Sequence, residues 1–262
     1  MKIKEVAVTL ERFAPLPLQE SYDNAGLQIG LTEAEDVSGV LLCLDVTEEV
    51  ILEAERLGCN LIVAHHPLLF RPLRHITGET QVERCVSMAI QKGIAIYAAH
   101  TNLDNAPGGV NFMIAEKIGL QSVQFLQPLP NGQGGSGIIG TLPQAMQQAD
   151  FVKMLKQTFH VESLMHNDFQ RNGGLIEKVA LCGGAGDFLL REAIHQGADA
   201  FLTGEMGYHF YFGHEADIFI GVMGHYQSEQ YTIQLLHRIL HEAHPRLRLV
   251  ETSVMTDPIR VD

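Results

Sequence analysis

Cysteine is scarce in this sequence, and the few cysteines are scattered. The four are Cys43, Cys59, Cys85 and Cys182; no two of them form a Cys-x-x-Cys pair, and most lie within apolar runs. Zinc ribbons need closely paired cysteines and disulfide scaffolds need a high density of them, so the sequence favours neither. Reduced thiols in a hydrophobic core are typical of an intracellular protein, and we expect a cytoplasmic location.

Positive charge is also scarce. Among 262 residues, 18 Lys and Arg stand against 31 Asp and Glu, which gives a formal net charge of −13. A surface of this sign opposes non-specific attraction to phosphate backbones and to anionic membranes. We therefore expect no nucleic-acid partner.

Long apolar runs are missing too. No stretch of about 20 apolar residues could cross a bilayer, so no membrane partner is expected. The first residues, "MKIKEVAVTLERFAP", lack the uninterrupted apolar region of a signal peptide. Their apolar positions follow helical spacing as far as Pro15, which predicts a helix at the start of the sequence.

The sequence does contain an alternation of strand-like and helix-like segments. In its first part, strands are predicted over 38–46, 60–66 and 94–100, with helices over 47–58 and 79–93. A similar series covers 177–205 and 217–225, and a helix is predicted over 228–243. Such alternation predicts an α/β fold with largely parallel sheets. The Pro- and Gly-rich segment Gln127–Gly137 marks a loop, so we place one lobe at 1–126 and a second at 127–262.

Two segments of the chain resemble each other. "GVLLC", beginning at Gly39, matches "KVALC", beginning at Lys178, at an offset of 139 residues. Further on, an offset of 125 aligns His100 with His225, and each is followed four positions later by an acidic residue. We interpret this as a weak internal repeat, and chance similarity of two α/β units is the alternative. A true repeat would bring ligands from equivalent strand ends into one shared cleft.

Two adjacent histidines follow a short apolar strand in "NLIVAHHPLLF", residues 60–70. Neighbouring side chains on a regular strand point to opposite faces, so His65 and His66 can share a side only if the chain leaves sheet geometry there. Pro67 favours that departure because it cannot donate a ladder hydrogen bond. Open α/β sheets bind ligands at strand ends of this kind.

Further candidate metal ligands lie elsewhere in the chain. His225 and Glu229 are four apart and would share one face of a helix, whereas Asp104 is expected in a loop after a strand. Together with His65 and His66 they supply three imidazoles and two carboxylates, which suit Zn, Fe, Mn, Co or Ni better than Ca or Mg. Two divalent ions about 3.5 to 4 Å apart, bridged by a carboxylate, are the usual hydrolytic pair. Five ligands for two ions leave positions open for water and substrate.

Several motifs in order resemble one known family. "YDNAGLQIG", "AHHPLLF", "AAHTNLDNAPGGVN", "VALCGGAGDFL", "LTGE" and "GHYQSE" are similar to the motifs of the Nif-three-like proteins, the GTP cyclohydrolase 1 type 2 homologues. The similarity runs from Asp23 to Glu229. One departure is Gly207, where relatives often carry a basic or polar residue. The chain is also too short to hold the domain that some relatives insert between their lobes.

The resemblance implies a fold, a site and an assembly. It implies two similar α/β/α lobes with largely parallel sheets, a dinuclear metal site in the cleft between them, and a toroidal homohexamer built as a trimer of dimers. By motif match, the family's metal ligands fall on His65, His66, Asp104, His225 and Glu229, with Glu229 as the bridge. The C-terminal part is expected to pack back on the shared cleft.

Other residues are candidates for chemistry rather than metal binding. The repeat places His100 and Glu205 by the cleft, where either could carry a proton, although both could instead orient the metal ligands. Asp23, Asn24 and Arg71 are candidates for substrate binding, although residues 24–26 could also be no more than a turn. The histidines expected on the surface of helices or loops are His160, His195, His237, His241 and His244.

These observations favour a metal-dependent hydrolase that acts on a nucleotide or phosphoester through a metal-activated hydroxide, with two divalent ions per chain. The alternative is a metal-binding, metal-delivering or regulatory adaptor protein without turnover.

Overall fold

The computed structural model describes residues 1–30 and 35–261. The chain forms two compact units, which are described separately below. The first consists of Met1–Ala106 and Thr232–Pro258, and the second of Pro107–Tyr231 and Ile259–Asp262.

The first unit is built on a five-stranded sheet with the order β1-β4-β3-β2-β11. Its strands are β1 (Gly26–Ile29), β2 (Val40–Cys43), β3 (Leu61–Ala64), β4 (Ala95–Ala98) and β11 (Leu249–Glu251). Only β1 runs antiparallel to its neighbour, so the predicted parallel sheet is confirmed. Every residue of β2, β3 and β4 is buried, as expected of parallel strands covered on both faces.

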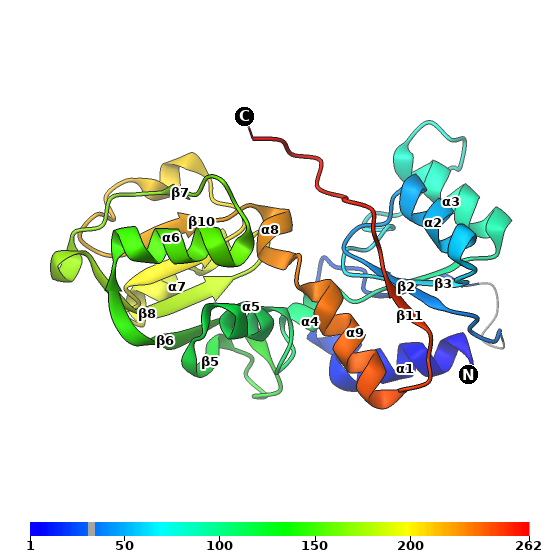
Figure 1. The fold of residues 1–262 in the computed structure, drawn as a ribbon, viewed down its shortest axis with the longest axis horizontal. Coiled ribbons are helices and arrows are strands. Elements are labelled where there is room, and N and C mark those ends of the chain that lie inside the picture. Colours follow the sequence, from blue (N-terminus) through cyan, green and yellow to red (C-terminus); the bar gives the residue numbers. More distant parts are fainter. Residues whose placement is uncertain (31–34, 262) are drawn as a thin grey trace. The chain divides into compact units, whose positions relative to one another are not determined.

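Helices cover both faces of this sheet. Figure 1 shows α2 (Glu48–Leu57) and α3 (Gln81–Lys92) on one side, and α1 (Ile3–Phe13) and α9 (Thr232–Ala243) on the other. Local sequence fixes the helix ends: the Thr47 hydroxyl accepts a hydrogen bond from the Val50 N–H, and α3 ends at Gly93 in the left-handed region. Two short helices, η1 (Leu16–Leu18) and α4 (Thr101–Asp104), complete the unit.

The second unit is built on a six-stranded sheet with the order β5-β6-β8-β9-β10-β7. Its strands are β5 (Gln121–Pro128), β6 (Gly135–Gln147), β7 (Met165–His166), β8 (Leu175–Cys182), β9 (Ala200–Thr203) and β10 (Phe219–Val222). The three strands β8, β9 and β10 are parallel, whereas β5, β6 and β7 are antiparallel to their neighbours. The predicted loop at Gln127–Gly137 is the tip of the β5–β6 hairpin.

The helices of the second unit lie on both faces of its sheet. They are α5 (Val110–Ile118), α6 (Gln148–Phe159), η2 (Arg171–Gly174), η3 (Asp187–Leu189), α7 (Leu190–His195), η4 (Tyr208–Tyr211) and α8 (His225–Glu229). On one face, Leu190 and Ala193 of α7 pack against Phe201 of β9. On the other, Phe151 of α6 lies edge-on to Phe219 of β10, with ring centroids 5.7 Å apart.

The internal repeat is present in the hydrogen-bond register. Val40 of β2 pairs with Leu61 of β3, and Val179 of β8 pairs with Ala200 of β9, each 139 positions after its counterpart. Each unit then adds a third parallel strand and an antiparallel strand beyond it, β4 and β1 in one and β10 and β7 in the other. The ends of β2 and β3 in the first unit therefore correspond to the ends of β8 and β9 in the second, 139 positions later.

The division of the chain differs from the linear prediction. The predicted boundary at residues 126 and 127 falls inside β5, whereas the units change at Ala106. Residues 232–258 belong to the first unit because β11 pairs in parallel with β2, with Val250 opposite Leu41. The helix predicted over 228–243 is accordingly two helices, α8 and α9, and the units change between them.

Among the helices of residues 1–30 and 35–261, none combines the length and the apolar character needed to cross a membrane.

Candidate metal centre

Two histidines follow β3 in the first unit. The strand ends at Ala64, and the side chains of His65 and His66 then lie close together, with ring centroids 4.9 Å apart. His65 is fully buried, and His66 is 22% exposed. The chain thus leaves regular strand geometry where the sequence predicted it, and both imidazoles reach one neighbourhood.

The Nδ1 atom of each ring is held by an oxygen. Nδ1 of His65 lies 2.7 Å from the carbonyl oxygen of Ala99, and Nδ1 of His66 lies 2.7 Å from Oδ1 of Asp45. Because a carbonyl or carboxylate oxygen only accepts, a proton belongs on Nδ1, and Nε2 is the ring atom left to bind a metal ion. Metal-binding histidines in proteins are oriented in this way.

Asp45 was not among the residues that the sequence pointed to. Burial opposes its ionisation, but the hydrogen bond and the charge of His66, with a hydrogen bond from Thr256, lower its pKa below the ordinary value. An ionised Asp45 orients His66 and makes its Nε2 more basic. Its position after β2, one strand over from His65, was the signal that could have identified it.

Asp104 lies in a short helix, not in the predicted loop. It is the last residue of α4, and its Oδ1 is 3.6 Å from Nε2 of His65. The His100 ring is also near, with its centroid 5.4 Å from that of His65 and 5.5 Å from that of His66. The first unit therefore gathers His65, His66, His100 and Asp104.

Asp23 supports His100. Its side chain is fully buried, and its carboxylate accepts hydrogen bonds from Nδ1 of His100 at 2.7 Å and from both the N–H and the hydroxyl of Thr101. Burial alone would raise its pKa, but these hydrogen bonds and the charge of His100 lower it to about 2. An enclosed carboxylate with these partners positions His100.

The other two predicted substrate residues occupy different settings. The Asn24 side chain donates a hydrogen bond to the carbonyl oxygen of Leu69 at 2.7 Å, so it fastens the loop that follows the two histidines. The turn considered for residues 24–26 gives way to a strand at once, because β1 begins at Gly26. Arg71 is exposed in the same loop.

The second unit carries its own donors on α8. His225 and Glu229 lie on one face of this helix, as predicted, with Nε2 of His225 3.1 Å from Oε2 of Glu229. Nδ1 of His225 lies 2.7 Å from Oε1 of Glu205. Glu205, itself 59% exposed, therefore orients His225 as Asp45 orients His66.

A glycine makes room for Glu229. Gly184 follows β8 with φ +61°, and a Cβ there would overlap with Oε1 of Glu229 and lie 3.4 Å from Cε1 of His225. Its N–H donates to the Ser228 hydroxyl at 3.0 Å. Gly184 is 139 positions after Asp45, so the repeat places a carboxylate at this strand end in one unit and an open space in the other.

The donor chemistry fits a metal. Three imidazoles have Nδ1 bound to oxygen, and Nε2 lies 3.6 Å from the Asp104 carboxylate in His65 and 3.1 Å from the Glu229 carboxylate in His225. This mixture of donors suits transition-metal ions. His65 and His66 in the first unit and Glu229 in the second are of the residue types that could hold such an ion.

The fold and these donors define a class: an α/β protein with two related sheets and candidate metal ligands at strand ends. The profile of the Duf34/NIF3 (NGG1p interacting factor 3) family matches residues 1–258, and the chain belongs to this family.

Known relatives agree with this assignment. A "GTP cyclohydrolase 1 type 2 homolog" of Clostridium perfringens is 34% identical over 232 residues, which cover 87% of each chain. A "NIF3-like protein 1" of Drosophila melanogaster is 33% identical over 79% of this chain and 70% of its own. Among solved structures, a Bacillus cereus protein related to NIF3 is 26% identical, covers 100% of this chain and 99% of its own, and has a TM-score of 0.88.

Proposed function

We propose that this protein binds two divalent transition-metal ions and is a metal-dependent hydrolase of a nucleotide or phosphoester. The residues that would hold the ions are His65, His66, Asp104, His225 and Glu229. The observation that carries the proposal is the state of the three imidazoles. Each has Nδ1 bound to an oxygen acceptor at 2.7 Å, which leaves Nε2 as the ligand atom.

The chain's own residues supply orientation and a proton carrier. Asp45 and Glu205 hold the imidazoles of His66 and His225 in place. His100, with Nδ1 bound to Asp23, presents Nε2 as the atom that can take a proton from water or return it to a leaving group. When bound, a pair of divalent ions lowers the pKa of coordinated water and so supplies a nucleophile near neutral pH.

Metal content tests the proposal directly. The protein is stripped with a chelator, reloaded with Mn²⁺ or Zn²⁺, freed of excess ion by gel filtration and analysed for metal per chain. We expect about two ions in the natural sequence and about one or none in His66→Ala and Glu229→Gln. Full metal content in both variants would contradict the site.

A control variant shows whether a loss of metal is specific to the proposed ligands or follows the removal of any histidine. His237 also forms a histidine–carboxylate pair, with Nδ1 2.8 Å from Oε1 of Glu251, but it lies on α9 outside the donor set. His237→Ala should retain the full metal content.

A non-catalytic role is the second candidate. The family description names an interacting factor, which favours an adaptor whose metal stabilises a partner-binding form. The metal-loaded protein is assayed on a panel of phosphoesters and nucleotides. Turnover that disappears in Glu229→Gln supports the hydrolase, and no turnover with any metal supports the adaptor.

Assembly and location complete the proposal. We propose a homohexamer, a trimer of dimers, that acts in the cytoplasm. Native mass spectrometry tests the assembly, and a mass of one or two chains would exclude the hexamer.

A further inference from the structure

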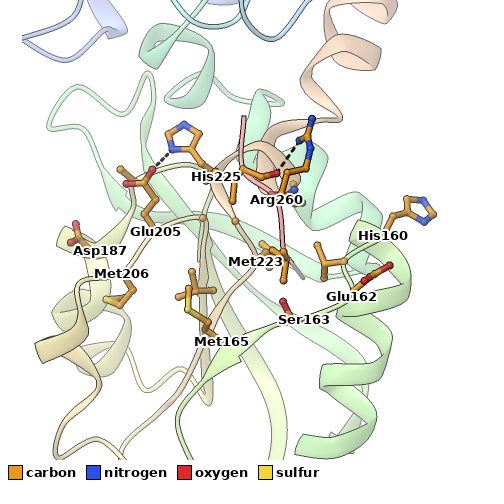
Figure 2. A pocket seen from close by; sticks show the side chains of 18 of the residues that line it. His160, Glu162, Ser163, Met165, Asp187, Glu205, Met206, Met223, His225 and Arg260 are labelled. Atoms are coloured by element: carbon orange, nitrogen blue, oxygen red, sulfur yellow. Dashed lines mark hydrogen bonds and ion pairs between the residues drawn. The ribbon is translucent and has the colours of Figure 1, made fainter. Parts of the chain in front are cut away.

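The second unit contains a cavity of about 830 Å³ next to His225 and Glu205. Figure 2 shows these two side chains joined at one end of the cavity, with Met165, Met206 and Met223 farther along. Its volume is in the range of small-molecule sites, which are about 300 to 1,000 Å³. The cavity therefore has the size for the organic part of a substrate whose reacting bond lies near His225.

Much of its lining is apolar and accessible. Met165, Ile259 and Val261 are 62%, 63% and 63% exposed, although each lines a hollow. Val222 and Met223 add buried apolar surface at the end of β10. Methionine side chains are flexible and polarisable, and they make favourable contacts with aromatic rings. Such a surface favours a flat, apolar ligand over a strongly hydrated one.

The charge of the lining has the opposite sign to that of a phosphate binder. Three carboxylates line the cavity, Glu162, Asp187 and Glu205, against one permanently charged cation, Arg260. Even with Glu205 set aside because it contacts His225, the two remaining carboxylates outnumber Arg260 among the described lining residues. A polyphosphate placed here would meet like charge in a partly enclosed space.

We propose that this cavity is the subsite for the uncharged, flat ring portion of the substrate, and that it rejects anionic groups. This rests on the proposed function, because it assigns the ring portion of the substrate to the cavity and leaves any phosphate outside it. A compound that enters the cavity is a neutral heteroaromatic ring with a short substituent.

The test uses the full chain, stripped of metal by a chelator, so that bound cations cannot attract phosphate. Binding is measured by calorimetry for matched neutral and anionic probes: adenosine and AMP, guanosine and GMP, nicotinamide and nicotinate. We expect the neutral member of at least one pair to bind with a dissociation constant below about 1 mM and roughly tenfold tighter than its anionic partner. Tighter binding of the anionic members, or no binding by any neutral probe, would overturn the proposal.

Variants locate the binding. Met165→Asp, at an exposed position on β7, should weaken binding of the neutral probe roughly tenfold, because it removes apolar contact and places a hydrated carboxylate in the lining. The double variant Glu162→Gln and Asp187→Asn removes two negative charges from the lining. It should therefore reduce the difference in affinity between the neutral and the anionic probes. Glu177→Gln removes one negative charge from exposed β8 surface outside the lining and should leave this difference unchanged. If Met165→Asp bound the neutral probe as tightly as the natural sequence does, the probe would bind outside this cavity, and the assignment of the cavity as the ring subsite would be wrong.

The outcome is independent of the metal site. Met165→Asp should retain the full metal content, and probe binding is measured without metal. Failure of the cavity proposal therefore leaves the metal measurements untouched, and failure of metal binding leaves the probe measurements interpretable.

Discussion

Oδ1 of Asp45 lies 2.7 Å from Nδ1 of His66, while the other oxygen of the same carboxylate accepts a hydrogen bond from the Thr256 hydroxyl at 2.8 Å. The carboxylate is therefore fixed from two sides, and it fixes the imidazole in turn. Because Nδ1 is bound to oxygen, the ring presents Nε2 in one orientation.

Replacing this carboxylate should weaken metal binding while His66 remains in place. We predict that Asp45→Asn lowers metal affinity about 10- to 100-fold, the usual effect of losing a partner that orients a ligand. Competition against a chromogenic chelator measures the change. Glu251→Gln removes the carboxylate from the comparable pair with His237 and should leave metal affinity unchanged. Equal affinities for Asp45→Asn and the natural sequence would show that the charge of Asp45 does not strengthen metal binding through His66.

The space left by Gly184 should also be necessary. A methyl group there would overlap with the Glu229 carboxylate, so Gly184→Ala should displace Glu229 and reduce metal content. Gly197→Ala is the matched control, because Gly197 also has a positive φ, +73°, but a Cβ there would meet nothing within 4 Å. Both variants should lose about 1 kcal/mol of stability from backbone strain. Only Gly184→Ala should lose metal, and equal metal content in the two variants would refute the steric argument.

A third prediction concerns the return of the chain to the first sheet. Glu53 of α2, 5% exposed, accepts hydrogen bonds from the hydroxyls of Thr252 and Ser253 directly after β11. Glu53→Gln should cost about 2 kcal/mol, because the lost hydrogen bonds are to a charged acceptor. Amide exchange at residues 249–251 should quicken. Glu55→Gln, on the same helix as Glu53, breaks an exposed contact with Lys92 of α3 and should change stability by less than about 1 kcal/mol. Similar losses in the two variants would mean that Glu53 does not fasten β11.

Local patterns in the sequence predicted the parts of the fold that local physics determines. The strands β2, β3 and β4 are uniformly apolar, and capping residues such as Thr47 and Gly93 mark their neighbouring helices. The His65-His66 pair was predictable because an apolar run that stops at polar residues marks a strand end. The helix of His225 and Glu229 was predictable from their spacing.

What depends on distant pairing was not predictable. The strand β11 has only three residues, and nothing in "LVE" shows that it pairs with β2 about two hundred positions earlier, so the linear division of the chain was wrong. Asp45 and Gly184 were missed because a single acidic residue or glycine after a strand is common. Only the 139-residue register of the repeat shows that both occupy the same strand-end position.

Asp23 gives the last prediction, and it concerns pH. Its pKa falls from 3.8 in the unfolded chain to about 2 in the folded protein, although burial acts against this, because His100 and Thr101 donate hydrogen bonds to the ionised form. A lowered folded-state pKa stabilises the protein fully above pH 3.8, and the contribution is lost as the pH falls toward 2. It amounts to about 2 kcal/mol at neutral pH.

Asp23→Asn should therefore be destabilised by about that amount at about pH 7 and by about half as much at about pH 3. Urea unfolding followed by circular dichroism measures both values, with Glu55→Gln as a surface control. A deficit that stayed constant between the two pH values would show that the hydrogen bonds to Asp23 do not depend on its charge, and His100 would then lack the anionic partner that makes it a proton carrier.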